Sequence, residues 1–283
     1  MASIHSSLAK GLARVSLRDL AETTAVALTA ATPRFKAARR KLRSAMLDDY
    51  AARLYHTSFY LFRHPSPGYG GILTYLTLLP VDEYEAVIHS AAKFGRRTDS
   101  QPLGDAVGPT ITLSRHCLER LHQRLAVGTL EELMESLRTD MLRVLLLAWC
   151  SVRGTEKMPL RQLSVPMLDG ALRCDVLDDD ALALKTFVRD PGLRERRLLS
   201  DLDAWFSGLD TPPEEILLLP YYLHTAKEFK AGSRQHQRAL DGFLASREAA
   251  WNIFREHDWL WEKYQRRDDP DKEAWDSLSS GPG

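Results

Sequence analysis

Residues 162–189 read QLSVPMLDGALRCDVLDDDALALKTFVR, and this stretch decides the fold class. Three runs rich in β-forming residues, at 163–168, 171–177 and 181–188, are separated by Asp169-Gly170 and by a turn of three aspartates at 178–180. Asp-Gly between alternating runs is among the strongest short-range signals for a β-hairpin. The stretch therefore predicts a three-stranded antiparallel meander at about 162–189. Pro166 predicts that its first strand lies at a sheet edge, because proline cannot donate to the hydrogen-bond ladder.

Strand alternation assigns the side chains of the third run to two faces. Thr186 shares a face with Leu184 and Val188, and we expect this to be the core face. Lys185 then projects from the other face, together with Phe187.

Helical patterns lie on both sides of the meander. Ser114 is expected to cap a helix that runs to about Val127, and Thr129 with Glu132 forms a capping box for a helix that runs to about Ser151. Further helices are expected at about 8–30, 34–62, 81–93, 193–206, 214–230 and 235–267, and short strands at 72–79 and 111–113. The sequence thus predicts an α+β protein in which a small antiparallel β-sheet is flanked by N- and C-terminal helices.

The chain of 283 residues is long enough for one large domain or two ordinary ones. We expect an N-terminal helical region with one strand (1–95), a helix-plus-meander core (111–190), a C-terminal helical region (191–270) and a disordered tail (271–283). A polar loop or linker joins the first two regions.

Composition excludes several classes of protein. Lys+Arg and Asp+Glu both number 38. This balance argues against a protein that coats nucleic acid or anionic membrane over its whole surface, but it is compatible with a local basic groove. The longest apolar stretch, at 144–150, is too short for a membrane span of about 20 residues. Cys117, Cys150 and Cys174 lack metal-ligand spacing, so we expect buried thiols, no metal, no cofactor and a cytoplasmic location.

One polar stripe on the expected helix after Ser114 is a candidate catalytic site. At helical spacing His116, Arg120 and Arg124 fall within an arc of about 80°. The imidazole can take a proton from a ribose 2′-hydroxyl, and the guanidiniums can hold the phosphate and its developing charge without a metal. The alternative is a solvated helix edge. His122 lies far around the helix and is expected in packing or at the surface.

The order of these features resembles the ribonuclease superfamily of barnase, EndoU, colicin and RelE-type toxins, in which a helix of the form Ser-x-His-x-x-x-Arg-x-x-x-Arg precedes a twisted antiparallel sheet. The resemblance covers about residues 111–190. It implies that His116 is the general base, that Arg120 and Arg124 bind phosphate, and that a polar residue of the last strand, Thr186 or alternatively Lys185, completes the site. Divergent members of the superfamily keep the fold as a binding module.

The sequence therefore favours a metal-independent endoribonuclease-like protein that acts on RNA phosphodiesters. The alternative is a non-enzymatic protein–protein interaction module with a helical partner surface on the aromatic C-terminal helix, and a small-molecule or nucleotide hydrolase also stays open. The aromatic residues that suggest a partner surface are Trp251, Trp259 and Trp261.

Two basic clusters are candidates for polyanion binding. Four cations follow the last strand and are expected close to the site, namely Arg189, Arg194, Arg196 and Arg197. A second cluster precedes the sheet and has no such constraint, namely Arg34, Lys36, Arg39, Arg40, Lys41 and Arg43. The first cluster is the one that we expect to bind substrate.

Overall fold

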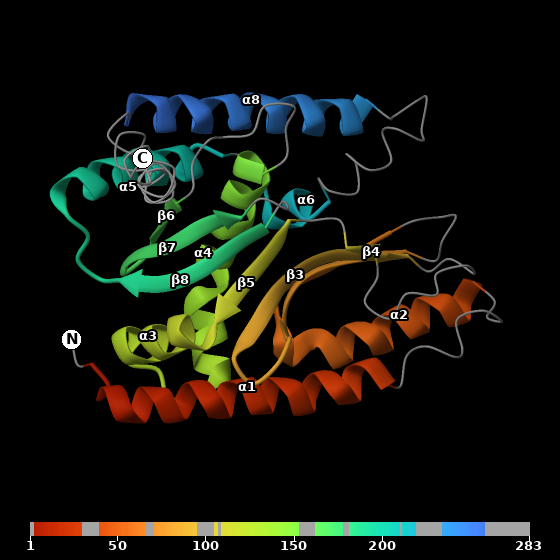
Figure 1. The fold of residues 1–283 in the computed structure, drawn as a ribbon. Helices are drawn as coiled ribbons and strands as arrows, with labels where there is room; N and C mark the ends of the chain where they lie inside the picture. The colour runs from red at the N-terminus through yellow and green to blue at the C-terminus, as the bar shows by residue number, and fades with distance from the viewer. Residues whose placement is uncertain are drawn as a thin grey trace, which may run out of the picture.

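The computed structural model describes residues 3–29, 40–65, 71–94, 105–106, 109–152, 162–177, 181–209, 211–218 and 234–257. The protein is α+β, as predicted, and is built around one mixed sheet (Figure 1). The described strands are β1 (Ser58–His64), β2 (Ile72–Pro80), β3 (Glu85–Phe94), β4 (Asp105–Ala106), β5 (Thr110–Ser114), β6 (Gln162–Met167), β7 (Gly170–Leu177) and β8 (Ala181–Val188).

The sheet is larger than predicted and is not purely antiparallel. Its strand order is β1-β2-β3-β5-β8-β7-β6, and β4 pairs with β3. The pair β5–β8 is parallel, whereas the other neighbours are antiparallel. A parallel pair needs a long crossover connection, and the residues between β5 and β8 supply it. Because β3 pairs with β5, strands of the expected N-terminal region and of the expected core belong to one sheet.

The three-stranded meander is confirmed. Strand β7 pairs antiparallel with β6 and with β8, and β6, which contains Pro166, ends the strand order as an edge strand. The Asp169-Gly170 turn brings Gly170 to φ +155°, where a Cβ atom would lie 2.3 Å from the carbonyl oxygen of Val188. Glycine is therefore required at this turn by the close approach of the neighbouring strand.

We expect Gly170→Ala to lower the free energy of unfolding by about 1–3 kcal/mol, because the backbone is strained and Val188 must shift. Thermal unfolding measures this change. The matched control is Gly11→Ala in an exposed position of a helix, where an added Cβ has no atom within 4 Å and alanine is expected to stabilise by about 0.5–1 kcal/mol. Equal stability of Gly170→Ala and the wild-type protein would contradict the account of this turn.

A β-bulge in β8 overturns the predicted assignment of faces. Arg173 pairs with Thr186 but the next residue, Cys174, pairs with Leu184, so Lys185 is an extra residue without a partner in the ladder. Such an insertion shifts the alternation of side chains by one position. Phe187 is consequently buried, and Thr186 is half-buried rather than on the core face.

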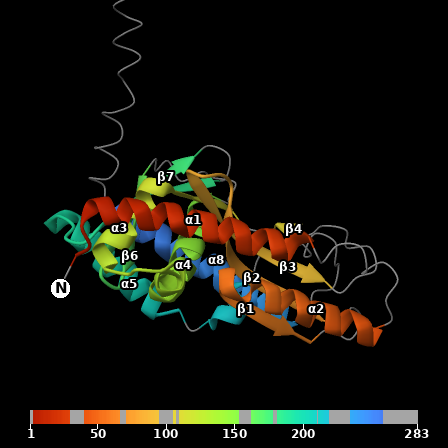
Figure 2. The same cartoon turned by 90° about the horizontal axis from the view of Figure 1, so that it is seen from below.

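The described helices are α1 (Ser6–Thr29), α2 (Arg40–Leu54), α3 (Arg115–Leu125), α4 (Leu130–Val152), α5 (Leu193–Ser207), α6 (Pro213–Ile216) and α8 (Arg234–Glu256), and a 3₁₀ turn, η2, covers Tyr55–Thr57. Helix α1 crosses one end of the sheet with α3 packed against it, and α5 and α8 lie at the opposite end (Figures 1 and 2). None of these described helices is long and apolar enough to cross a membrane.

One expected helix is wrong and another is confirmed only in part. Most of residues 81–93 belongs to β3 rather than to a helix. The helix expected at 34–62 is present as α2 over Arg40–Leu54, but residues 58–62 belong to β1. From Glu85 to Ser90, the side chains of Ala86, Ile88 and Ser90 are buried while the residues between them are partly exposed, which is the two-residue period of a strand. The acidic residues that suggested a helix start form a turn instead, in which Asp82 Oδ1 accepts a hydrogen bond from the Tyr84 N–H at 2.7 Å.

Several expectations lie outside the described residues. They are the aspartate turn at 178–180, most of the loop at 95–110, the helix beyond residue 218, the last helix beyond residue 257, the tail at 271–283, and Arg34, Lys36, Arg39, Trp259 and Trp261.

Candidate functional site

Helix α3 is fixed at its start to two other elements. Ser114 caps the helix, as predicted, because its Oγ accepts a hydrogen bond from the Cys117 N–H at 3.2 Å. The same hydroxyl donates to the carbonyl of Leu184 in β8 at 3.5 Å. The Arg115 N–H donates to the carbonyl of Tyr84, in the turn before β3, at 2.7 Å. The first turn of α3 therefore lies beside β8 and beside the β2–β3 turn.

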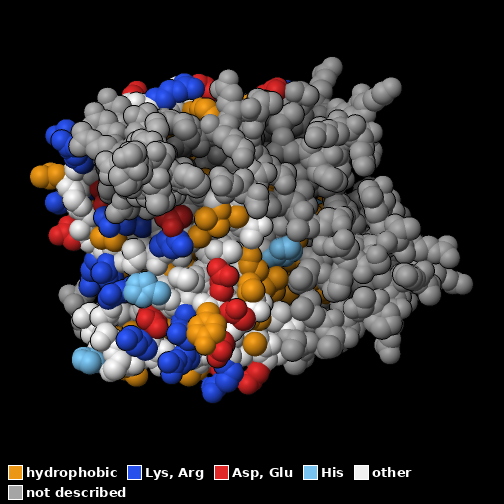
Figure 3. Space-filling view, viewed as in Figure 1, with side chains coloured by type: hydrophobic (Ala, Val, Ile, Leu, Met, Phe, Trp, Pro, Cys, Tyr) orange, Lys and Arg blue, Asp and Glu red, His pale blue; other side chains and the backbone are white. Residues whose placement is uncertain are grey.

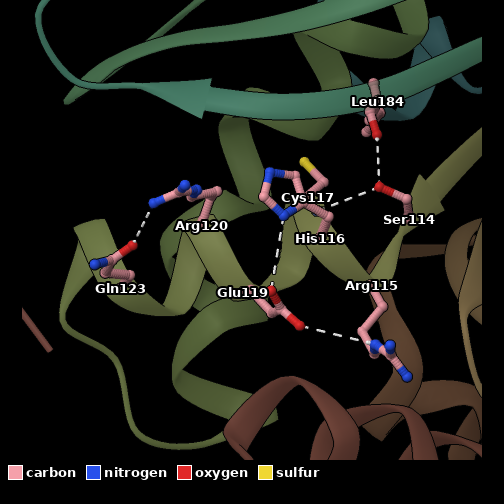
Figure 4. A network of polar contacts seen from close by, with 8 residues as sticks. All are labelled: Ser114, Arg115, His116, Cys117, Glu119, Arg120, Gln123 and Leu184. Carbon is pink, nitrogen blue, oxygen red and sulfur yellow. Dashed lines mark hydrogen bonds and ion pairs between the residues drawn. The ribbon is translucent and has the colours of Figure 1, made fainter. Parts of the chain in front are cut away.

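The predicted stripe lies along the more exposed side of α3. The His116 side chain is 58% exposed, and its Nδ1 lies 3.7 Å from Glu119 Oε2 (Figure 4). Glu119 is itself held by Arg115, whose Nε lies 3.8 Å from its other carboxylate oxygen. Arg120 Nη1 donates to Gln123 Oε1 at 2.9 Å, one turn along the same ridge. The imidazole therefore stands one helical turn from a guanidinium.

The two arginines of the stripe contact neutral acceptors. Arg120 binds an amide oxygen, and Arg124 donates to the backbone carbonyl of Phe187 in β8. Within the part of the chain that the structure describes, no carboxylate forms an ion pair with either side chain. Burial lowers the pKa of Arg124, and the positive charges of Arg120 and Arg173 lower it further. An anion bound here would relieve that repulsion.

The candidates from the last strand lie beside this ridge. Hydrogen bonds from α3 reach the carbonyls of Leu184 and Phe187, which bracket Lys185 and Thr186. Lys185 is exposed at the bulge, and its Nζ lies 3.4 Å from Asp175 Oδ2. Neither Lys185 nor Thr186 is among the residues that line the groove between α1 and α3.

His116 and Arg120 line a groove of about 780 Å³ between α3 and α1. The groove is lined by Arg115, His116, Glu119, Arg120 and Gln123 of α3, by Ser6, Ala9, Lys10 and Arg14 of α1, and by Ser114 and Tyr84. On the face seen in Figure 3, Lys and Arg side chains gather over α3 and β8. Sequence reasoning missed Lys10, Arg14 and Tyr84 as site residues. The four-residue spacing of Lys10, Arg14 and Arg18, which places them on one helix face, was the available signal.

His122 holds the two walls of the groove together. It is buried, in agreement with the prediction of packing or surface. Its Nδ1–H donates to the carbonyl of Val127 at 2.9 Å, which leaves Nε2 to accept from the Ser16 hydroxyl of α1 at 2.9 Å. Burial lowers the pKa of His122, so the folded protein holds this side chain neutral.

We expect His122 to destabilise the fold in acid. Because its pKa is lower in the folded than in the unfolded chain, its contribution is complete above the unfolded value of about 6.5 and is lost as the pH falls below it. The measured quantity is the difference in unfolding free energy between the wild-type protein and His122→Gln. Below pH 6.5 this difference should decrease by at most about 1.4 kcal/mol per pH unit. Other titrating groups contribute equally to both proteins, so their effects cancel in this difference. Asp140 is one of them, because burial raises its pKa to about 6. A difference that is constant from pH 8 to pH 5 would contradict the assignment.

The basic residues after β8 lie at the start of α5. Arg194, Arg196 and Arg197 are exposed there, and Arg189 is partly exposed. Glu195, between them in sequence, is buried and binds Arg173 through two contacts of 2.6 and 3.1 Å. Glu195 therefore ties the start of α5 to Arg173, whose positive charge also acts on Arg124 of the ridge. The cations of α5 are not among the residues that line the α1–α3 groove.

The described residues offer no thiol nucleophile and no metal centre. Cys117, Cys150 and Cys174 are buried, as expected, and burial raises the pKa of all three, to about 12 for Cys150. The described residues contain no group of three His, Cys, Asp or Glu side chains placed to hold a metal ion.

Trp251 does not form part of an exposed partner surface. Only 9% of this residue is exposed, and its Nε1 donates to the carbonyl of Cys150 at 3.0 Å. The prediction of a partner surface that includes Trp251 is therefore wrong, because this ring joins α8 to α4 in the core.

Comparison of the chain with protein-family models, with curated proteins and with solved structures found no match.

Proposed function

We propose that the protein is a metal-independent endoribonuclease that cleaves RNA phosphodiesters at the ridge of α3. One observation carries the proposal. The exposed imidazole of His116 lies on the same helical ridge as Arg120 and Arg124, two guanidiniums that no described carboxylate neutralises. A general base beside an unneutralised anion site is what phosphodiester transfer requires.

The chemistry uses the ribose itself as the nucleophile. His116 Nε2 takes the proton of the 2′-hydroxyl, and the 2′-oxygen forms a bond to phosphorus. The bond from phosphorus to the 5′-oxygen breaks, and the leaving oxygen keeps the electron pair and takes a proton from water. The imidazolium returns its proton to water. The products are a 2′,3′-cyclic phosphate and a 5′-hydroxyl.

The neighbouring residues position these groups. Glu119 is a positioning residue, because its carboxylate beside Nδ1 favours a proton there and leaves Nε2 unprotonated. Arg120 and Arg124 bind the phosphate and stabilise the charge that develops on it. Thr186 or Lys185 adds a polar contact from β8, which is supported by the two hydrogen bonds that tie this strand to α3. We further propose a cytoplasmic location, since the three cysteines are free thiols.

Purified protein incubated with total RNA in EDTA tests the proposal. We expect cleavage in EDTA and products that carry cyclic phosphate and 5′-hydroxyl ends. Cleavage that appears only after a divalent metal is added overturns the mechanism. If the wild-type protein cuts no better than His116→Ala, the protein is not this enzyme.

The cations at the start of α5 are expected to bind the flanking RNA backbone. Charge reversal at Arg194, Arg196 and Arg197 should weaken polyanion binding more than reversal at Arg39, Arg40 and Lys41, because only the first set is tied to the strand that carries Lys185 and Thr186. Each lost phosphate contact should lower, by about 0.7 for a single strand, the magnitude of the slope of log affinity against log salt concentration. Filter binding over a salt series measures both. Equal losses from the two sets would show that neither is specific to the site.

The alternative is a protein–protein interaction module that does not act on RNA. With Trp251 buried, it has less support than the sequence suggested. The same salt series separates the two functions, because such a module need not bind RNA at all.

A further inference from the structure

The groove beside His116 continues past the catalytic ridge. A second hollow of about 650 Å³ shares Arg14, Tyr84 and Arg115 with the first, so the two adjoin along α1. Lys10 and Arg14 are one turn apart on the α1 wall, at a rise of about 6 Å. The groove therefore offers a track that is longer than one phosphate.

The excess of positive charge falls along this track. Lys10 and Arg14 are exposed at the end nearest His116, and within the described residues neither forms an ion pair. The far hollow is lined by Arg14, Arg18 and Arg115 but also by Asp82 and Glu83, and Arg18 lies 3.5 Å from Asp19. A polyanion is therefore attracted more strongly to the near hollow than to the far one, where two carboxylates offset the cations.

An exposed aromatic ring lies where the two hollows meet. Tyr84 is 53% exposed, and the guanidinium carbon of Arg115 lies 4.6 Å from the centroid of its ring. Hydrogen bonds fix the backbone on both sides, from the Tyr84 N–H to Asp82 and from the Arg115 N–H to the Tyr84 carbonyl. A rigid ring supported by a guanidinium is a platform for a nucleobase, which stacks on either type of plane.

We propose that the α1–α3 groove binds the single-stranded RNA segment next to the cleaved phosphate. Lys10 and Arg14 contact its phosphates, Tyr84 stacks an unpaired base, and Asp82 with Glu83 ends the track. The identity of the ligand as substrate rests on the proposed nuclease function, whereas its binding can be measured without catalysis. An acidic peptide would satisfy the two cations but would leave the ring unused. A duplex keeps its base faces covered and offers nothing to Tyr84.

Fluorescence anisotropy with a labelled 2′-O-methyl oligouridylate tests the proposal, because this strand has no 2′-hydroxyl to react. Lys10→Gln with Arg14→Gln is expected to weaken binding at least 10-fold and to lower the log–log salt slope by about 1.4 for two lost contacts. Tyr84→Ala is expected to weaken binding by about 5- to 150-fold. The matched controls are Arg138→Gln with Arg238→Gln, which removes the same charge from exposed positions, and Tyr55→Ala, which removes an exposed ring outside the groove. The controls are expected to change affinity less than twofold.

Losses in the controls equal to those in the groove variants overturn the proposal. So does a duplex, or an oligoglutamate of equal charge, that binds as tightly as the single strand. If wild-type protein fails to cut RNA but strand binding depends on Lys10, Arg14 and Tyr84, the nuclease proposal fails while the proposal of RNA binding in the groove is supported. If cleavage depends on His116 but strand binding is unchanged in all three groove variants, the groove proposal fails while the nuclease proposal is supported.

Discussion

Replacing His116 by alanine is expected to lower kcat/KM for RNA cleavage by about 10²- to 10⁴-fold, the usual contribution of a general base. The imidazole is 58% exposed, and among the described residues its polar side-chain partner is Glu119, so its loss removes a proton acceptor without opening a cavity. The fold should therefore keep its thermal stability. A fluorogenic oligoribonucleotide assayed in EDTA gives the rate, and thermal unfolding checks the fold.

The matched control is His56→Ala, an exposed histidine of the 3₁₀ turn η2 far from α3 in sequence. Its rate should stay within a factor of two of wild type. A loss of less than 10-fold in His116→Ala, or an equal loss in His56→Ala, would remove His116 from the chemistry.

Replacing Arg120 or Arg124 by alanine is expected to lower kcat by about 10²- to 10³-fold, as when one donor to a developing oxyanion is removed. Each guanidinium contacts a neutral acceptor and is free to shift its charge toward a phosphate. Lysine at either position keeps the charge but loses the planar fork, so it should restore part of the rate. An effect on KM alone would show that the arginines bind the strand without acting on the transition state.

Arg124 needs its own structural check. Its side chain also donates to the carbonyl of Phe187, so Arg124→Ala removes a tie between α3 and β8. Arg138→Ala, at an exposed ion pair on α4, is the control for loss of charge. If Arg124→Ala lowers the melting temperature and the rate, while Arg124→Lys restores the melting temperature fully but the rate only in part, the guanidinium acts in the reaction as well as in the fold.

The features that could be predicted from sequence are those set by local chemistry. Asp169-Gly170 fixes a hairpin through its own backbone, and Ser114 and Thr129 cap the helices that follow them. The spacing of His116, Arg120 and Arg124 is a property of one helix, so the stripe was visible before the fold.

The features that could not be predicted depend on partners distant in the chain. Residues 85–94 form a strand because they pair with β2 on one side and with β5 on the other. The residues of the segment alone do not reveal these two partners. The bulge at Lys185 is visible only in the pairing of β8 with β7. The groove requires α1 to pack on α3 through Ser16 and His122, residues that are 106 positions apart. Lys10, Arg14 and Tyr84 therefore became site residues only in the folded chain.

In the proposed reaction the ribose 2′-oxygen attacks phosphorus after His116 takes its proton. An oligoribonucleotide with one 2′-deoxy substitution at the cleaved position, incubated in EDTA beside its all-ribose parent, tests this most directly. We expect the parent to give a 2′,3′-cyclic phosphate and a 5′-hydroxyl, and the deoxy strand to stay uncut at that position. Cleavage of the deoxy strand at the parent's rate would contradict the account.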